Sequence, residues 1–176
     1  MGKIKYLAFA LLVSITITSC KSDDGDGGGG EQANTCSEAS GQTAQGNFRG
    51  DQFVTPGGTY IEAPGSGNGF NCTIYVKAPN NTDCVFPTFD GTQDTILFSI
   101  DALEPQTLVL SELAGSNTLN FNRIENGTTT VELATCGVLE ITSYDAAAGE
   151  LRGTIIAEGQ VNSEIDGSFT LSLCVF

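Results

Sequence analysis

The sequence predicts an all-β protein whose domain is a single antiparallel β-sandwich of about 8–10 strands. Apolar and polar residues alternate with a period of two along most of the chain after residue 36, which is typical of strands with one buried face. Gly, Pro, Asn and Asp separate nearly all of these segments, as tight turns require. A closed antiparallel β-barrel is the alternative arrangement of the same strands.

The alternating segments follow one another at turn-length intervals. Their apolar positions lie at Phe48 and Phe53, Tyr60–Ile61, Phe70–Ala78, Ile96–Ile100, Leu108–Leu110, Leu119–Phe121, Val131–Leu133, Leu139–Ile141, Leu151–Ala157 and Phe169–Val175. The region Gln106–Ser116 is the one stretch that also admits a short helix.

One hairpin allows a prediction of register. A two-residue turn at Asn126-Gly127 would place Phe121 opposite Glu132 and so mix the apolar and polar faces. A three-residue loop, residues 125–127, places Phe121 opposite Val131 and Leu119 opposite Leu133. We therefore expect the three-residue loop, because a slip by one residue exposes a whole apolar face.

The N-terminus carries an export signal. Lys3 and Lys5 precede an apolar run that begins at Tyr6 and is too short to span a bilayer. Ser19-Cys20 ends this run, as a small residue followed by cysteine does in bacterial lipoprotein signals. Residues 1–19 are thus the expected signal peptide, and Cys20 becomes the lipid-bearing first residue of the mature chain. Two or three acyl chains give stable anchoring.

The segment after Cys20 is a tether. Residues 20–35 combine an acidic run with Gly27–Gly30, a composition typical of flexible linkers. The acidic run resembles the signal that sends Bacteroidota lipoproteins to the outer face of the outer membrane. The expected location is that surface, with the periplasmic face as the alternative. Residues 36–176 then form the β-domain, which is long enough for one core.

Composition excludes several classes of function. The formal net charge is −14, which disfavours nucleic acid as a partner. The absence of His excludes Ser-His-Asp and Cys-His nucleophile systems and His-based metal sites. The absence of Trp weakens stacking platforms for sugars. No metal or other cofactor is expected.

The remaining cysteines are disulfide candidates, because exported proteins fold in an oxidising environment. An odd number leaves at least one thiol free or paired between molecules. Cys72 and Cys84 are the most local pair, although Cys72 also suits a buried thiol. Direct pairing of Cys136 with Cys174 is disfavoured, because a simple up-down-up meander of their strands puts the two cysteines at its opposite ends. A disulfide can instead link Cys36, in the N-terminal segment, to Cys136 or to Cys174. These candidates are Cys36, Cys72, Cys84, Cys136 and Cys174.

The C-terminal third has a layout of glycines and alternating strands in Gly137–Asp145, Gly149, Gly153-Thr154 and Asp166–Phe169. With the signal and Gly46–Phe48, this layout resembles small surface lipoproteins of the Bacteroidota, of flavobacterial type, for which no activity is known. The resemblance implies a lipid-anchored β-domain and supplies no site residues.

Candidate sites are few. Tyr60, Tyr75 and Tyr144 are candidate ligand contacts for a sugar or peptide. Thr95, in Asp94-Thr95-Ile96, resembles an O-glycosylation motif of the Bacteroidota. Paired carboxylates such as Glu132 with Glu140 are the one catalytic arrangement that the composition permits.

Nothing in the sequence selects such a pair, so we expect no enzyme and no catalytic residue. The expected role is a lipid-anchored ligand-binding or accessory module with a glycan or protein ligand. A structural, fimbria-like or surface-layer subunit is the alternative, and a carboxylate-based hydrolase is the third.

Overall fold

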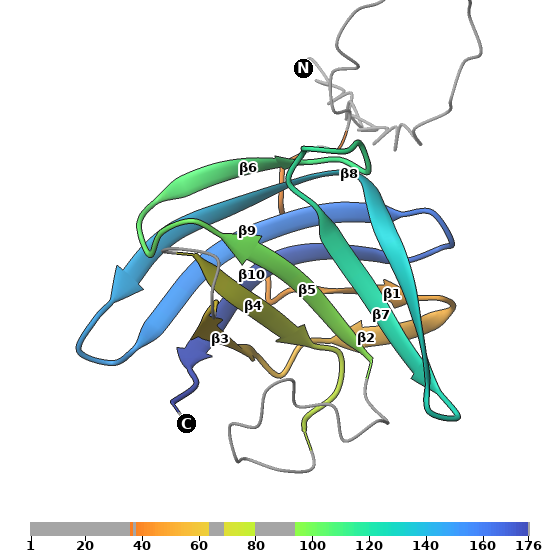
Figure 1. Cartoon of the computed structure of the whole chain (residues 1–176), viewed down its shortest axis with the longest axis horizontal. Coiled ribbons are helices and arrows are strands. Elements are labelled where there is room, and N and C mark those ends of the chain that lie inside the picture. Colours follow the sequence, from red (N-terminus) through yellow and green to blue (C-terminus); the bar gives the residue numbers. More distant parts are fainter. Residues whose placement is uncertain (1–35, 37, 64–68, 80–93, 176) are drawn as a thin grey trace, which may run out of the picture. The chain divides into compact units, whose positions relative to one another are not determined.

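The computed structural model describes residues 36, 38–63, 69–79 and 94–175. Ten strands make up the regular structure of these residues, and no helix occurs among them. Their bounds are β1 Gln45–Phe48, β2 Asp51–Val54, β3 Gly58–Glu62, β4 Phe70–Tyr75, β5 Thr95–Ile100, β6 Gln106–Leu110, β7 Leu119–Glu125, β8 Thr128–Asp145, β9 Glu150–Gly159 and β10 Glu164–Leu173 (Figure 1).

Seven of the strands close into a barrel. Pairing runs from β10 through β3, β4, β5, β7, β8 and β9 back to β10. Only the β10–β3 contact in this ring is parallel. The all-β prediction is confirmed, and the arrangement is the barrel that the sequence left as the alternative. Opposite walls of the barrel nevertheless pack face to face, as the two sheets of a sandwich do. Phe98 of β5 contacts Phe169 of β10 across the interior, with ring centroids 5.8 Å apart.

Strand β8 explains why the sheet closes. It is 18 residues long and its register shifts at Ala134/Cys136 and at Ile141/Ser143. Such bulges bend a strand and increase its twist. One edge of β8 pairs first with β7 and then with β6, while the other edge pairs with β9 from Ala134 to Asp145. Figure 1 shows β8, β9 and β10 side by side as a long curved wall.

The short strands β1, β2 and β6 lie outside the ring. Strand β1 pairs with β10 and with β2. Strand β6 occupies Gln106–Leu110, where the sequence also admitted a helix, and it pairs with β8. Ladder pairing to a long neighbour, with Leu110 fully buried, favours the strand over the helix.

One apolar core fills the barrel. Its largest fully buried side chains come from almost every strand: Tyr60, Phe48, Phe121, Ile74, Ile96, Leu110, Leu119, Leu139, Ile141, Leu151, Ile155 and Ile165. Most of these buried side chains lie at positions that the sequence predicts to face the core. Val131 and Leu133 are predicted to face the core as well, but they do not, because the β7–β8 hairpin has the other register.

The β7–β8 turn contains two residues. Glu125 pairs with Thr128, and Phe121 pairs with Glu132. Asn126 and Gly127 have φ values of 51° and 75°, the positive pair of a type I′ turn. The predicted three-residue loop is therefore wrong. Glu132 points inward and is 1% exposed, whereas Val131 points outward and is 53% exposed.

Candidate functional site

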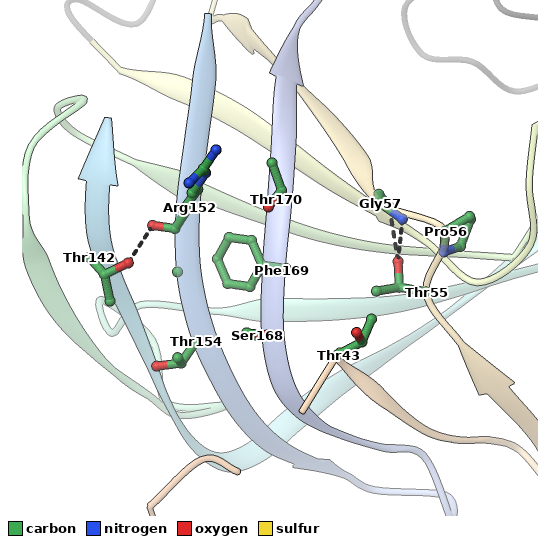
Figure 2. A pocket seen from close by; sticks show the side chains of 11 residues that line it. Thr43, Thr55, Pro56, Gly57, Thr142, Arg152, Thr154, Ser168, Phe169 and Thr170 are labelled. Carbon is green, nitrogen blue, oxygen red and sulfur yellow. Dashed lines mark hydrogen bonds between the residues drawn. The ribbon is translucent and has the colours of Figure 1, made fainter. Parts of the chain in front are cut away.

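A groove on the outer face of the barrel is the candidate site. It has a volume of about 460 Å³ and crosses β8, β9 and β10 beside the segment that precedes β1 and the β2–β3 connection. Hydroxyl side chains dominate its lining, as Figure 2 shows, and Arg152 and the largely buried Phe169 are also among the lining residues. These hydroxyl residues are Thr43, Thr55, Thr142, Thr154, Ser168 and Thr170.

Strand register produces this array. Thr154 pairs with Ser168, and Arg152 pairs with Thr170. Residues two apart on a strand share a face, so these four side chains all point outward while Gly153 and Phe169 point inward. An isolated parallel bridge places Thr43 beside Ser168 and extends the row by one position.

Half of the hydroxyls in the groove are already used within the fold. Thr142 Oγ1 donates to Arg152 O at 3.1 Å, and Ser168 Oγ donates to Gln42 O at 3.0 Å. Thr55 Oγ1 lies 2.8 Å from Tyr75 O and 2.9 Å from Gly57 O.

The side chains of Thr43, Thr154 and Thr170 make no hydrogen bond with any described residue. Their hydroxyls can both donate to and accept from a ligand.

Arg152 supplies the one cation in the lining. Its guanidinium donates to Glu150 Oε2 at 2.6 Å, and the Arg152 side chain is 57% exposed. The hydrogen bond and charge of Glu150 raise the pKa of Arg152 above its ordinary value. A guanidinium has five N–H donors, so donors remain for a ligand after the Glu150 contact. The groove therefore offers directional polar contacts with little net charge.

A second polar cluster surrounds Glu132 inside the barrel. Its carboxylate accepts from Ser163 Oγ at 2.7 Å, from Arg49 Nε at 3.3 Å and from the backbone N–H of Val161. These donors come from the β1–β2 and β9–β10 turns. The space above the carboxylate is tight, because a Cβ on Gly159 would collide with it. This buried acid is fully hydrogen-bonded and holds two turns against β8.

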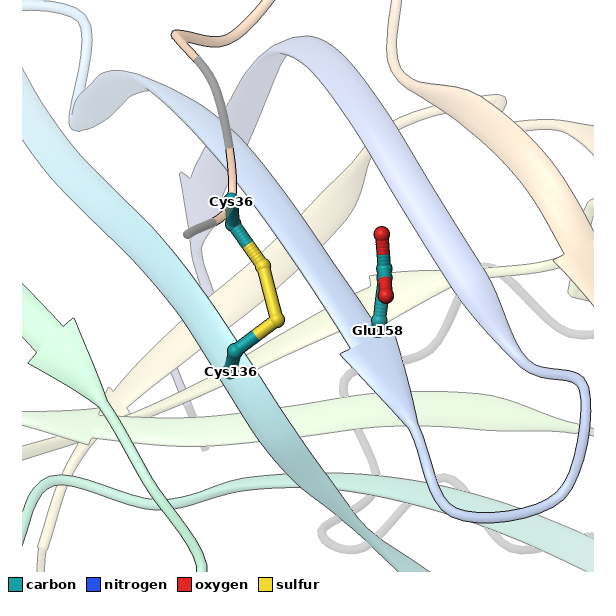
Figure 3. A group of neighbouring side chains, drawn as sticks. All are labelled: Cys36, Cys136 and Glu158. Atoms are coloured by element: carbon teal, nitrogen blue, oxygen red, sulfur yellow. A yellow bond between two sulfur atoms is a disulfide. The ribbon is translucent and has the colours of Figure 1, made fainter. Parts of the chain in front are cut away.

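A disulfide joins the N-terminal segment to β8. Cys36 and Cys136 are bonded, with their Cα atoms 6.3 Å apart and a sequence separation of 100. Glu158 lies directly opposite Cys136 on β9, as Figure 3 shows. The two sulfur atoms and a Glu158 oxygen lie within 4.8 Å of one another. Because both sulfurs are in the disulfide, they are not the thiolates that a metal site of this composition needs.

The other cysteines are placed as follows. Cys72 is a free thiol on the core face of β4 and is fully buried, so it does not pair with Cys84, and the buried-thiol alternative is confirmed. Burial raises the pKa of the Cys72 thiol above its ordinary value. Cys174, just after β10, is disulfide-bonded. Cys84 and the lipid-attachment candidate Cys20 lie outside the described residues.

The three candidate tyrosines do not gather into one open site. Tyr60 and Tyr144 pack edge to face with centroids 6.4 Å apart, and Tyr60 is 1% exposed. Burial and its neighbour Tyr144 raise the pKa of Tyr60. Tyr75 is also buried and its Oη lies 3.0 Å from Thr59 Oγ1. None of these tyrosines lines the groove described above.

Two further candidates lose their structural basis. Thr95 is 1% exposed at the start of β5, so its hydroxyl is not accessible to a glycosyl donor in the folded domain. Glu132 and Glu140 lie on opposite faces of β8, one buried and one exposed. The bulge at Ala134/Cys136 separates them, because it reverses the side-chain parity of the strand. The proposed carboxylate pair is therefore not formed.

Sequence reasoning missed the groove. Thr142, Thr154 and Thr170 occupy polar positions of alternating strands, and nothing in one strand indicates which polar faces will meet. The isolated bridge at Thr43 and the β2–β3 connection bring in segments far away in the chain.

Comparisons of the chain with known protein families, with curated proteins and with solved structures gave no match. The described residues contain no helix of the length and hydrophobicity that crossing a membrane requires.

Proposed function

We propose that this protein is a non-catalytic, lipid-anchored surface module that binds a neutral glycan in the groove across β8, β9 and β10. The observation that carries the proposal is the set of three unengaged hydroxyls, on Thr43, Thr154 and Thr170, beside the exposed guanidinium of Arg152. A polyhydroxylated ligand matches this lining because each of its hydroxyls can pair with a group that both donates and accepts.

Charge supports a neutral ligand over an acidic one. The chain has a formal net charge of −14, and the one cation in the groove is already paired with Glu150. A polyanion would meet repulsion from the rest of the surface. Apolar atoms of Pro56 also line the groove and suit the less polar face of a sugar ring. A protein ligand is the alternative occupant.

Anchoring is the second part of the proposal. The apolar run that ends in Ser19-Cys20 supports lipid attachment at Cys20, and the acidic residues that follow support the outer face of the outer membrane. A tethered module at that location meets glycans continually, so a weak binding site is sufficient for retention.

Barrel closure argues against the structural alternative. A fibre that grows by strand addition needs a long unpaired edge. Among the described strands, β2 and β6 each have one neighbour, and they contain only 4 and 5 residues. The other eight described strands are paired on both sides.

A glycan array tests the proposal with the mature chain in detergent. We expect saturable, selective binding that falls about tenfold in a Thr154→Val, Thr170→Val double variant, the loss expected for two hydrogen bonds. Thr107→Val is the matched control, because Thr107 is exposed on β6 and is not one of the residues that line the groove. Silence across the array, or equal binding by the double variant, would contradict the proposed site.

A further inference from the structure

A strap of the chain crosses the outer face of the β8–β10 wall and meets the groove at one end. Cys36 is bonded to Cys136 of β8, and shortly afterwards the backbone N–H of Ser40 donates to Asp166 Oδ1 of β10 at 2.7 Å. Strand β9 pairs with both β8 and β10, so the chain between these two anchors passes over β9 (Figure 1). We call residues 38–44 the strap.

Strand register determines where the strap crosses the wall. Cys136 lies opposite Glu158 on β9, and Asp166 lies opposite Ile156. The strap therefore crosses β9 at the level of these two β9 residues, just beyond the groove residue Thr154. Residues two apart on a strand share a face, so the groove and the crossing point lie one after the other on the outer face of β9.

Hydrogen bonds hold the strap against β10. Ser168 donates to Gln42 O through its backbone N–H at 2.7 Å and through its Oγ at 3.0 Å, and the Ala44 N–H donates to Ser168 O at 2.8 Å. The strap comes this close because residue 167 is glycine, and a Cβ there would collide with Gln42 O and with the backbone of Ala44. These contacts fix the strap on the wall at the level of Ser168.

The strap separates the groove from a second hollow on the same wall. Thr43 lines the groove, as Figure 2 shows, whereas its neighbour Gln42 lines the second hollow, which has a volume of about 410 Å³. Ile156 and Asp166 also line this second hollow, and the two hollows have no lining residue in common. Consecutive residues of the strap thus face opposite hollows, and the strap is the partition between them.

Exposure increases along the groove with distance from the strap. Thr154 and Ser168, the pair next to the strap, are half-buried. Arg152 and Thr170, the next pair along the same two strands, are exposed. The strap therefore closes one end of the groove, and the other end is open to solvent. A groove of this shape admits the end of a chain-like ligand more readily than a stretch from its interior.

We infer that the groove binds the terminal rings of a neutral glycan chain and that the strap excludes the interior of the chain. This inference rests on the proposed function. A volume of about 460 Å³ suits a short stretch of sugar rings. A terminal ring has a free hydroxyl where an interior ring has a glycosidic linkage, and the hydroxyls of Thr43 and Thr154 can pair with that extra group. Surface glycans are attached through their reducing ends, so the rings that reach the groove are the non-reducing ones.

Limited acid hydrolysis tests this preference, because it multiplies chain ends while the mass of polysaccharide stays constant. The probes are amylose, mannan, xylan and a mixed-linkage β-glucan, each coupled to beads before and after hydrolysis, with the mature chain in detergent. We expect the protein bound at saturation to rise in proportion to the number of chain ends, about tenfold for a tenfold increase in ends. Borohydride reduction of the reducing ends should leave binding unchanged.

A variant with both anchors of the strap removed tests the role of the strap. Cys36→Ser, Cys136→Ser, Asp166→Ala removes the disulfide and the acceptor of the Ser40 N–H and changes none of the groove residues. We expect this released variant to bind more of the unhydrolysed polysaccharide than the wild type does and to gain less on hydrolysis. Glu164→Ala is the control, since Glu164 is an exposed acid on the same face of β10, and it should behave as the wild type. Circular dichroism establishes that both variants are folded.

Several results would overturn the inference. Bound protein that follows polysaccharide mass, or no binding to any of the four probes, contradicts recognition of chain ends. Binding lost on borohydride reduction contradicts the assignment to the non-reducing end. An equal gain on hydrolysis by the wild type and the released variant, or a folded released variant that binds neither form, contradicts closure of the groove by the strap. Selective binding on the glycan array together with any of these results leaves the proposed function standing, whereas a silent array overturns both.

Discussion

Glu132 lies directly opposite Phe121 in the β7–β8 ladder, and both side chains are buried. An acid and an aromatic ring thus share the inner face of the barrel where the sequence pattern predicts two apolar residues. The carboxylate is tolerated there because Ser163, Arg49 and the Val161 N–H all donate to it. The same register places Val131 and Leu133 outside.

Glu132→Ala should destabilise the protein by about 3 kcal/mol, because it leaves buried donors on Arg49 and Ser163 without an acceptor. Urea unfolding followed by circular dichroism measures this change. Glu140→Ala is the matched control, since Glu140 is exposed on the same strand, and it should change stability by less than about 0.5 kcal/mol. Equal effects of the two substitutions would mean that the Glu132 contacts contribute nothing.

Gly127→Ala should cost about 1 kcal/mol, because residue 127 has a φ of 75° that an L side chain rarely adopts. The space around Gly127 is open, so the cost comes from the backbone alone. Gly41→Ala, at another open position without positive φ, is the comparison and should be close to neutral. Thermal unfolding of both variants measures the difference. A neutral Gly127→Ala would speak against the type I′ turn.

Cys72 should resist alkylation in the native protein. Burial raises the pKa of its thiol, so little reactive thiolate forms at pH 8, and the sulfur is out of reach of reagents. We expect iodoacetamide to label Cys72 at least about a hundredfold more slowly in buffer than in denaturant. Mass spectrometry of the Cys72 peptide over time measures both rates. Rapid labelling in buffer would show that β4 opens locally.

Removing the Cys36–Cys136 disulfide with a Cys36→Ser, Cys136→Ser double variant should lower stability by about 3 kcal/mol. The reason is that the crosslink closes a segment of 100 residues and so restricts the unfolded chain. Comparison of urea midpoints measures the loss. An unchanged midpoint would mean that the linkage fixes only the N-terminal segment and leaves the barrel unaffected.

Much of the fold follows from local pattern. Alternation in Leu151–Ala157 and Phe169–Leu171 predicts strands with the correct inward faces, because both lie in regular stretches of β9 and β10. The pattern at Val131–Leu133 predicts the wrong face. There, the turn geometry of Asn126-Gly127 and the contacts of Glu132 outweigh the burial of two aliphatic residues.

Closure and the groove depend on long-range pairing that local pattern does not encode. The bulges of β8 and the parallel β10–β3 contact decide between sandwich and barrel. The groove requires Thr43 to reach Ser168 from a segment far away in the chain. Among the sequence-based site candidates, Tyr60, Tyr75 and Thr95 are buried. Ligand contact by the two tyrosines and glycosylation of Thr95 therefore stay predictions that the exposed fractions of these side chains do not support.

The register of the β7–β8 hairpin underlies both the buried position of Glu132 and the outward position of Val131, and NMR of the isotope-labelled chain tests it most directly. Contacts between backbone protons across the ladder identify which residue faces Phe121. We predict cross-strand contacts from Phe121 to Glu132 and from Glu125 to Thr128. Contacts from Phe121 to Val131 instead would establish the three-residue loop, with Glu132 outward and Val131 inward, and would contradict this account.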